Sequence, residues 1–219
     1  MRPHTLRVPK PLIDVNGEPF LGPLLRSLRR RGVCDVVLLT GYLGEMIAEY
    51  AGDGAAFGVH VRYISDGEVP LGTAGAVRAA LPLLGDRFLV TFGDVYHAVD
   101  YSDVVRAFES SGRAGLMAVY RYRGSGTDAP NASVSGGLVT RYDKQVRWPD
   151  AEYVDSGLSA FSADAFATLA PGQPADLTVV NQRLIADNEL TAYVVDSRPF
   201  EIGSPTGLEE TARRMRIDK

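Results

Sequence analysis

Short apolar runs alternate with amphipathic segments over the first 120 residues, and this alternation restricts the fold more than any other feature of the chain. Apolar residues recur at helical spacing in the segments 20–31, 43–50, 74–84 and 104–110. Other short segments have the patterns of strands: 36–39, 59–64, 88–92 and 115–120. Because strands that alternate with helices usually form parallel sheets, we expect an α/β fold, with a mostly parallel mixed sheet and helices on both faces.

The pattern becomes richer in strands in the remaining residues. Residues 131–161 have strand patterns, with a turn at Gly136 and Gly137. Further helices are predicted at 163–169, 178–187 and 208–215, and a further strand at 190–195. Since no linker, repeat or low-complexity tract interrupts residues 1–219, we expect one domain whose two parts divide at about residue 120.

The composition argues against several classes of protein. A net charge of −4 without a basic stripe argues against a nucleic-acid binder. No apolar run is long enough to span a bilayer, and the N-terminus lacks the apolar core of a signal peptide, so we expect a cytoplasmic protein without a membrane partner. Cys34 is the only cysteine, which excludes an intrachain disulfide, and its apolar neighbours predict a buried thiol.

Two charged residues stand out by their surroundings. Lys10 lies between Pro9 and Pro11, which deny the backbone a helix, in a chain where lysine is scarce. A lysine held in this way can act as a positioned charge for a phosphate, and an exposed lysine on a proline-rich arm is an equally good interpretation. Asp94 comes just past the apolar strand at 88–92, where α/β folds bind ligands, so a magnesium ligand is favoured there over a turn aspartate.

The other candidates are weaker when taken singly. Leu71, Gly72 and Thr73 precede a helix with small residues, which let a base or phosphate approach the backbone but equally make a tight turn with a threonine cap. Glu201 lies between apolar neighbours, where it is either a second metal ligand or a strand residue. Isolated charges such as Lys144 are more often solvated surface groups than ligand contacts.

Taken in order, these motifs resemble those of the sugar-phosphate nucleotidyltransferases, also called NDP-sugar pyrophosphorylases. Met1-Arg2-Pro3-His4-Thr5 and Pro9-Lys10-Pro11-Leu12 match the second half of the family's nucleotide-loop signature in register. Three later motifs resemble the family's base-reading turn, its Gly-Asp metal motif and its late Asp-x-Gly-Thr-Pro motif: Pro70-Leu71-Gly72-Thr73-Ala74-Gly75, Gly93-Asp94 and Glu201-Ile202-Gly203-Ser204-Pro205. The resemblance implies a Rossmann-like nucleotide-diphospho-sugar transferase fold, with a nucleotide-facing part over about 1–120 and a sugar-facing part over about 121–219.

The resemblance also implies a reaction, in which the oxygen of a sugar 1-phosphate attacks the α-phosphorus of an NTP to give an NDP-sugar and pyrophosphate. The metal would be Mg²⁺, held by Asp94 and Glu201, and the catalytic residues would be Asp94 and Lys10, which would neutralise charge developing on pyrophosphate. The nucleotide would be bound by Leu71, Gly72 and Thr73. The sugar phosphate would be bound by Asn131, Asp143, Lys144 and Asp155.

The chain also departs from the family's pattern. Met1 falls just after the position of the Gly-x-Gly-Thr-Arg loop, so we expect upstream codons to encode an apolar strand and that loop. Two alternatives stay open: a non-catalytic or regulatory homologue that lost the loop, and a nucleotide-sugar-dependent glycosyltransferase. The second would need an Asp-x-Asp motif, which Asp94-Val95-Tyr96 does not provide. The sequence names neither the sugar nor the base, and it leaves the oligomeric state open, a homo-oligomer included.

Overall fold

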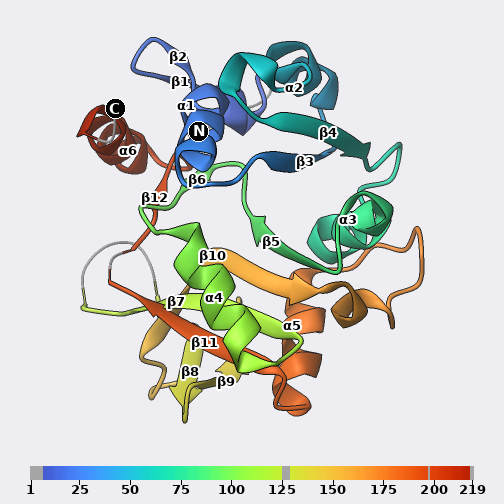
Figure 1. Cartoon of the computed structure of the whole chain (residues 1–219). Coiled ribbons are helices and arrows are strands. Elements are labelled where there is room, and N and C mark those ends of the chain that lie inside the picture. Colours follow the sequence, from blue (N-terminus) through green and yellow to red (C-terminus); the bar gives the residue numbers. More distant parts are fainter. Residues whose placement is uncertain (1–6, 125–128, 197, 218–219) are drawn as a thin grey trace. The chain divides into compact units, whose positions relative to one another are not determined.

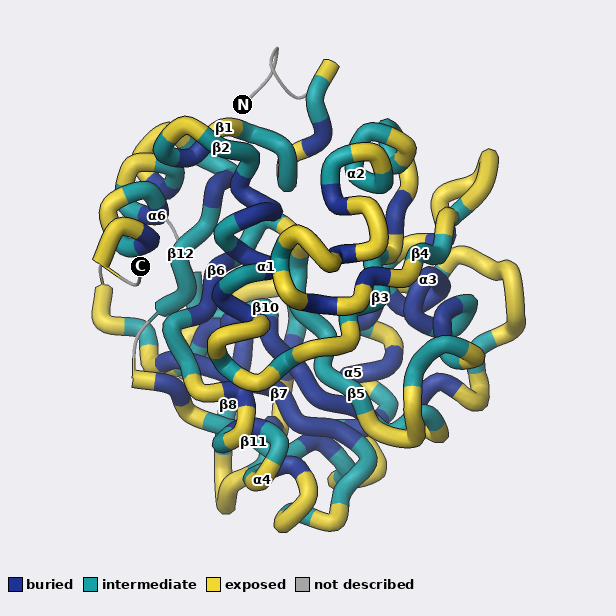
Figure 2. Tube along the Cα trace, turned by 45° about the horizontal axis from the view of Figure 1, so that its top comes forward, coloured by how far each residue is buried: buried dark blue, intermediate teal, exposed yellow. Residues whose placement is uncertain are grey.

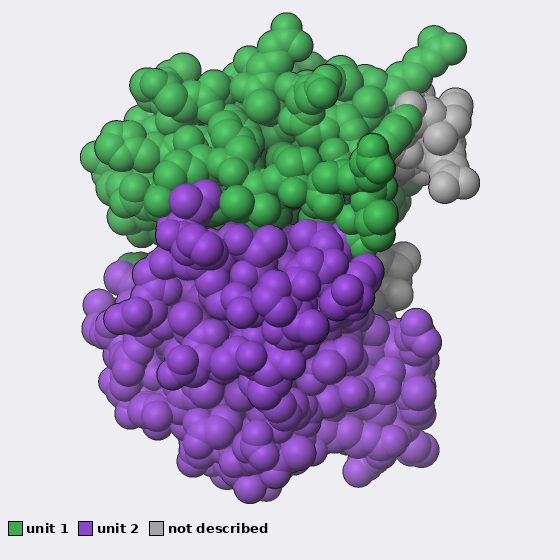
Figure 3. Space-filling model, turned by 90° about the vertical axis from the view of Figure 1, so that its right-hand side faces the viewer, with its two compact units in different colours: residues 1–70, 92–101, 199–219 green, residues 71–91, 102–198 purple. Residues whose placement is uncertain are grey.

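The computed structural model describes residues 7–124, 129–196 and 198–217, and the predicted motif at residues 1–5 lies outside these ranges. The chain divides into two compact units that interleave along the sequence (Figure 3). Unit 1 comprises Met1–Pro70, Phe92–Tyr101 and Pro199–Lys219, and unit 2 comprises Leu71–Thr91 and Ser102–Arg198. The units therefore do not follow a division near residue 120, and the expectation of one domain stays a prediction.

Unit 2 is built on a six-stranded sheet with the order β5-β10-β7-β11-β9-β8 (Figure 1). Its strands are β5 (Arg87–Thr91), β7 (Gly115–Arg121), β8 (Ala132–Ser135), β9 (Leu138–Tyr142), β10 (Tyr153–Ser162) and β11 (Leu190–Val195). β7 and β11 are parallel, whereas β10 runs antiparallel to both of its neighbours, β5 and β7. The α/β class and a mixed sheet are as expected, but most pairings in this sheet are antiparallel, because β10 lies between β5 and β7 and β9 runs antiparallel to β11 and β8.

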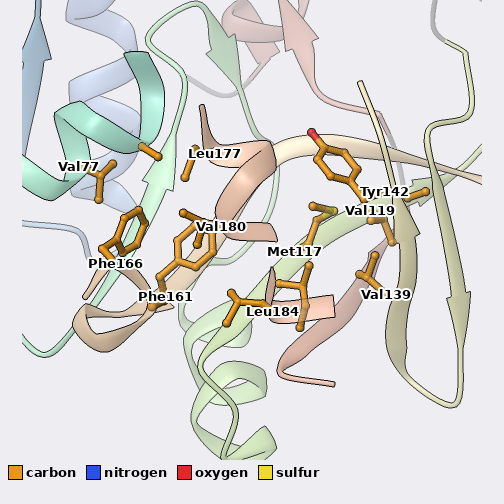
Figure 4. Packing of buried hydrophobic residues seen from close by; sticks show 14 residues of the cluster. Val77, Met117, Val119, Val139, Tyr142, Phe161, Phe166, Leu177, Val180 and Leu184 are labelled. Atoms are coloured by element: carbon orange, nitrogen blue, oxygen red, sulfur yellow. The ribbon is translucent and has the colours of Figure 1, made fainter. Parts of the chain in front are cut away.

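Helices cover both faces of this sheet. Figure 1 shows α4 (Tyr101–Ser111) on one face and α5 (Leu177–Ala186) on the other. Side chains alternate along a strand, so Met117 and Val119 of β7 point to the α5 face, where they join Phe161, Val180 and other apolar residues in one core (Figure 4). The rest of β7 up to Tyr120 is buried as well, so this strand lies in the interior of unit 2 (Figure 2).

A third helix of unit 2, α3 (Gly72–Ala80), packs against the start of α5 and continues as the 3-10 turn η4 (Leu81–Leu83). The helix predicted at 163–169 is wrong, because only the 3-10 turn η5 (Ala163–Phe166) forms there. In that turn Ala165 and Phe166 are fully buried against the core cluster. The segment therefore contributes two side chains to the core of unit 2 directly after β10.

Unit 1 contains small sheets with helices beside them. Its strands are β1 (Asp14–Val15), β2 (Glu18–Pro19), β3 (Asp35–Thr40), β4 (His60–Ser65), β6 (Val95–Tyr96) and β12 (Phe200–Glu201). Its helical elements are η2 (Lys10–Leu12), α1 (Leu21–Arg30), α2 (Gly44–Ala51), η3 (Ala55–Phe57) and α6 (Pro205–Ile217). β3 and β4 form a parallel pair, and β6 and β12 an antiparallel pair.

In unit 1 the expected burial of Cys34 is wrong, and one apolar strand is less covered than its sequence pattern indicates. Cys34 is exposed, and it lies in the irregular segment directly before β3. The strand predicted at 36–39 does form as β3, but its apolar residues are half-buried or exposed, with Leu39 at 37% exposure. Among the described residues β3 pairs on one side only, with β4, so an apolar run of the kind found in buried strands is only partly covered. Separately, no helix in the described ranges has the length and apolarity needed to cross a membrane.

Candidate active site

Unit 1 brings together three of the predicted site residues from distant parts of the chain. Lys10 lies in η2, Asp94 directly precedes β6, and Glu201 ends β12. The antiparallel pairing places Glu201 opposite Val95, and the Ile202 N–H donates to the Asp94 carbonyl at 3.1 Å. Backbone pairing therefore holds the two acidic residues next to each other, although they are more than a hundred positions apart in the sequence.

Lys10 belongs to the same group of charges. Its Nζ lies 3.2 Å from Asp94 Oδ2, and both side chains are partly exposed, at 48% for the lysine and 28% for the aspartate. A Cβ placed on Gly203 would stand 2.5 Å from Glu201 Oε2 and 4.0 Å from Lys10 Nζ. The lysine and the second carboxylate thus both lie close to Gly203, where any side chain would collide with the Glu201 carboxylate.

The carboxylate of Glu201 is held at the start of α6. Its Oε1 accepts a hydrogen bond from Ser204 Oγ at 2.7 Å, and its Oε2 accepts one from the Gly203 N–H. Ser204 Oγ in turn accepts from the Gly207 N–H at 3.0 Å, which satisfies a donor of the first helical turn. These bonds fix the position of the carboxylate, and each oxygen keeps a second lone pair for another donor or a cation.

The donor set of this group fits a divalent cation that is shared with a ligand. Among the residues that the structure describes, no cluster of three or more His, Cys, Asp or Glu is able to enclose a metal. Two carboxylates on neighbouring strands are available instead. Mg²⁺ is commonly bound by one or two carboxylates together with substrate phosphates, and it prefers such oxygen ligands.

Unit 2 brings together a second group of the predicted residues. Asn131 Oδ1 accepts the Asp155 N–H at 2.8 Å, and the Asn131 carbonyl accepts the Asp143 N–H at 3.1 Å. Tyr142 Oη donates to Asp155 Oδ2 at 2.8 Å, while Asp155 Oδ1 accepts the Gly157 N–H at 2.8 Å. The predicted sugar contacts Asn131 and Asp155 are therefore neighbours, joined through the backbone of β10.

The protein environment raises two pKa values in this group. Desolvation raises the pKa of the Asp155 carboxyl, and this effect outweighs the opposing hydrogen bonds from Gly157 and Tyr142. Burial also raises the pKa of the Tyr142 hydroxyl, and the neighbouring charge of Asp155 raises it further. The tyrosine consequently keeps its proton and remains the donor to the carboxylate.

Lys144 pairs with a residue that the sequence did not single out. Its Nζ lies 3.0 Å from Asp176 Oδ1 and 3.2 Å from Oδ2. Asp176 is also the N-cap of α5, since Oδ1 accepts the Thr178 N–H at 2.8 Å. An aspartate directly before a helical pattern is a recognisable cap signal, but nothing local in the sequence shows that this cap meets Lys144.

Asp143 has a structural role of its own in this loop. Its Oδ1 accepts the backbone N–H groups of Gln145 and Val146, each at 2.8 Å. These hydrogen bonds lower the pKa of the Asp143 carboxyl, assisted by the charges of Arg141 and Arg147. The carboxylate therefore stabilises the turn that presents Lys144, and a direct contact between Asp143 and a sugar phosphate stays a prediction.

The turn at Leu71, Gly72 and Thr73 packs against the segment that leads into α5. Gly72 has a φ of +67°, and a Cβ there would stand 2.7 Å from the Ala175 carbonyl oxygen. A Cβ on Gly75 would stand 2.8 Å from the Gln173 carbonyl oxygen. The close approach of the chain's own backbone thus accounts for these glycines, and their contact with a nucleotide stays a prediction. The turn belongs to unit 2 with Lys144, not to unit 1 with Lys10.

Comparison with known proteins identifies the family of the chain. A family model described as nucleotidyl transferase matches residues 1–129. The chain belongs to the nucleotidyl transferase family.

Curated relatives share substantial sequence with this nucleotidyl transferase. N-acetylmuramate alpha-1-phosphate uridylyltransferase of Neisseria meningitidis is 43% identical over 103 residues, which are 47% of this chain and 45% of the relative. Mannose-1-phosphate guanylyltransferase of Mycobacterium tuberculosis is 29% identical over 216 residues, 94% of this chain and 58% of the relative. The chain therefore spans about half the length of the curated relatives it matches.

Solved structures confirm the fold. A chain from Bacillus anthracis in complex with a sucrose superposes with a TM-score of 0.83 at 20% identity, over 99% of this chain and 90% of that one. HddC from Yersinia pseudotuberculosis superposes with a TM-score of 0.77 at 20% identity, over 94% and 90% of the two chains. The Rossmann-like fold expected from the sequence is thereby confirmed.

Proposed function

We propose that this chain transfers a nucleotidyl group from an NTP to a sugar 1-phosphate, which gives an NDP-sugar and releases pyrophosphate. The observation that carries the proposal is the meeting of Lys10, Asp94 and Glu201 in unit 1. An ammonium paired with one carboxylate, and a second carboxylate on the neighbouring strand, form a combination suited to a polyphosphate and its divalent cation. Membership of the nucleotidyl transferase family supports the same reaction.

In this proposal the residues of unit 1 serve the triphosphate. Asp94 and Glu201 would hold Mg²⁺, which would supply neutralisation of phosphate charge. Lys10 donates to the phosphates and stabilises the charge that grows on the departing pyrophosphate as the bond to the α-phosphorus breaks. The backbone hydrogen bond from Ile202 to Asp94 keeps the two acidic residues on neighbouring strands side by side. The backbone that carries the two carboxylates therefore has to move little during transfer.

The residues of unit 2 serve the sugar 1-phosphate. Lys144 donates to its phosphate, whose oxygen is the nucleophile that forms the new bond to the α-phosphorus. Asn131 and Asp155 offer hydrogen bonds to sugar hydroxyls. Relatives named for N-acetylmuramate 1-phosphate and mannose 1-phosphate support this class of acceptor, and their names pair it with uridylyl and guanylyl donors.

Pyrophosphate release tests the proposal. The full chain is mixed with Mg²⁺, one of UTP, GTP or dTTP, and one of N-acetylmuramate 1-phosphate, mannose 1-phosphate or glucose 1-phosphate. We expect at least one pair to release pyrophosphate in step with an NDP-sugar, and we expect no release when either substrate or the metal is omitted. Pyrophosphate release that does not depend on a sugar 1-phosphate would contradict the proposal.

A further inference from the structure

Asp176 joins three parts of unit 2 through one carboxylate. Besides the bonds to Lys144, its Oδ1 accepts the Thr178 hydroxyl at 2.6 Å and the Thr178 N–H at 2.8 Å. Its Oδ2 accepts the hydroxyl of Thr73 at 3.2 Å, and that hydroxyl in turn accepts the Leu177 N–H at 2.8 Å. The carboxylate therefore lies where the start of α5, the start of α3 and the loop carrying Lys144 meet.

The aspartate is rigidly placed, because the backbone around it is fixed from several directions. Ala175, its neighbour, donates its N–H to the Leu71 carbonyl at 2.9 Å, and its own carbonyl accepts the Ala74 N–H at 2.9 Å. Leu177 and Val180 on the first turn of α5 are buried in the core cluster of unit 2. A group on such a framework is a good anchor for a more flexible partner.

Lys144 is such a partner. It lies in the loop between β9 and β10, and its side chain is 36% exposed. A lysine side chain is long and has many rotamers, so an unanchored ammonium would lose much conformational freedom on binding a phosphate. An ammonium carries three N–H donors, and a carboxylate and a phosphate can share them.

We propose that Asp176 positions the Lys144 ammonium for the phosphate of a sugar 1-phosphate. The inference rests on the proposed function and adds to it a residue that acts through Lys144. Thr73 holds the opposite oxygen of the same carboxylate, so the turn before α3 contributes to the position of the lysine as well. In this view Thr73 takes part in the site as a support of Asp176.

The state of ionisation of Asp176 agrees with this role. Burial acts to raise its pKa, but hydrogen bonds from Thr178 and from Lys144 outweigh burial and hold the pKa at about 2. The carboxylate is therefore charged at any pH at which a sugar phosphate is a dianion. Asn at this position would keep the cap and the shape of the side chain while removing the charge that Lys144 faces.

Calorimetric binding tests the inference without requiring turnover. Full-length wild type, Asp176→Asn, Lys144→Ala, the double variant and Asp187→Asn are titrated with glucose 1-phosphate, mannose 1-phosphate and N-acetylmuramate 1-phosphate, and separately with UTP and GTP. Asp187 is the matched control, because it is an exposed aspartate at the other end of α5. The single tryptophan, Trp148, lies in the same loop as Lys144 and provides a fluorescence readout of the same titrations.

We expect Asp176→Asn to weaken sugar 1-phosphate binding about fivefold, the upper range for a partly exposed ion pair, and to leave NTP binding unchanged. The effect should disappear in the Lys144→Ala background. Equal affinity in wild type and Asp176→Asn would overturn the inference, and so would an equal loss with and without Lys144. If wild type bound no sugar 1-phosphate and released no pyrophosphate, the proposed function itself would fail and the inference with it.

Discussion

The two groups of charged residues are held in different ways. In unit 1, Lys10 and Asp94 meet across an exposed ion pair, and the main support of the carboxylates is the short pairing of β6 with β12. In unit 2, Lys144 faces an aspartate that also caps a helix and accepts a threonine hydroxyl from another element. The aspartate of the second group is therefore held by hydrogen bonds from several elements, whereas the Asp94 side chain pairs with Lys10.

The sheets of the two units differ in how far their strands are buried. β7 is buried from Gly115 to Tyr120 and has a strand on each side, whereas β3 has only β4 beside it in the described part of the chain. Stability should therefore depend more on the sheet of unit 2, while the chemistry should depend more on the charges of unit 1. The predictions below test that contrast.

The largest expected effect is on turnover. Asp94→Asn should lower kcat about a thousandfold, since the loss of a metal-anchoring carboxylate removes on the order of 4 kcal/mol of transition-state stabilisation. The melting temperature should change little, because the Asp94 side chain is partly exposed and the Asn variant keeps the backbone bond to Ile202. Asp35→Asn is the control, as it makes the same change at an exposed carboxylate at the start of β3 and should keep full turnover. Near-normal turnover of Asp94→Asn at limiting Mg²⁺ would show the metal assignment to be wrong.

The next effect is on stability. Leu116→Ala in β7 should lower the free energy of unfolding by about 3 kcal/mol, because the side chain is fully buried and leaves a cavity. Leu38→Ala in β3 makes the same change at a half-buried position and should cost roughly half as much. Urea unfolding of both variants measures the difference. Equal losses would mean that the two sheets contribute alike, contrary to their burial.

Variants of the two lysines, Lys10 and Lys144, should change different kinetic parameters. Lys144→Ala should mainly raise KM for the sugar 1-phosphate, whereas Lys10→Ala should mainly lower kcat, since charge on pyrophosphate grows only as the bond breaks. Each removes a charge-assisted contact worth roughly 1.5–3 kcal/mol, so each effect should be about tenfold or more. Arginine at either position should rescue only in part, because its planar group does not replace a compact ammonium. A shift of the same parameter for the same substrate in both variants would contradict the assignment of the lysines to different substrates.

The smallest effect is a pH dependence of stability. The pKa of Asp176 is lowered to about 2 in the folded protein, so its contribution is present above the unfolded-state pKa of about 3.9 and is lost as pH falls toward 2. The difference in unfolding free energy between wild type and Asp176→Asn should therefore shrink between pH 4 and pH 2. His97, whose pKa burial lowers to about 4, is present in both proteins, so its titration cancels in the difference. If the difference in unfolding free energy stayed constant from pH 4 to pH 2, the stabilising ion pair between Asp176 and Lys144 would be contradicted.

Much of the fold could be predicted because the apolar periodicities reflect burial. The helix expected at 20–31 forms as α1, with Leu21, Leu24, Leu25 and Leu28 buried on one side, and the strand expected at 115–120 forms as β7. The antiparallel placement of β10 between β5 and β7 was not predicted, because strand order is a property of long-range pairing. The exposure of Cys34 was missed for a similar reason, as its apolar neighbours lie in β3, which within the described ranges pairs with β4 alone.

The candidate site could be predicted in part. Lys10, Asp94 and Glu201 were recognised from local motifs, and the structure places them together. Asp176 could not be assigned a role, because its partners Thr73 and Lys144 are distant in sequence and meet it only in the folded unit. The glycines of the turn before α3 have a local explanation in packing that the sequence could not distinguish from ligand binding.

Transfer of a labelled phosphorus tests the central claim most directly. Full-length protein is incubated with Mg²⁺, a sugar 1-phosphate that supports pyrophosphate release, and the matching NTP labelled at the α-phosphorus. We predict that the label appears in an NDP-sugar, with one unlabelled pyrophosphate released for each transfer, and that Asp94→Asn suppresses both products together. Recovery of the label as free nucleoside monophosphate, or its persistence in the NTP while pyrophosphate accumulates, would contradict nucleotidyl transfer to a sugar 1-phosphate.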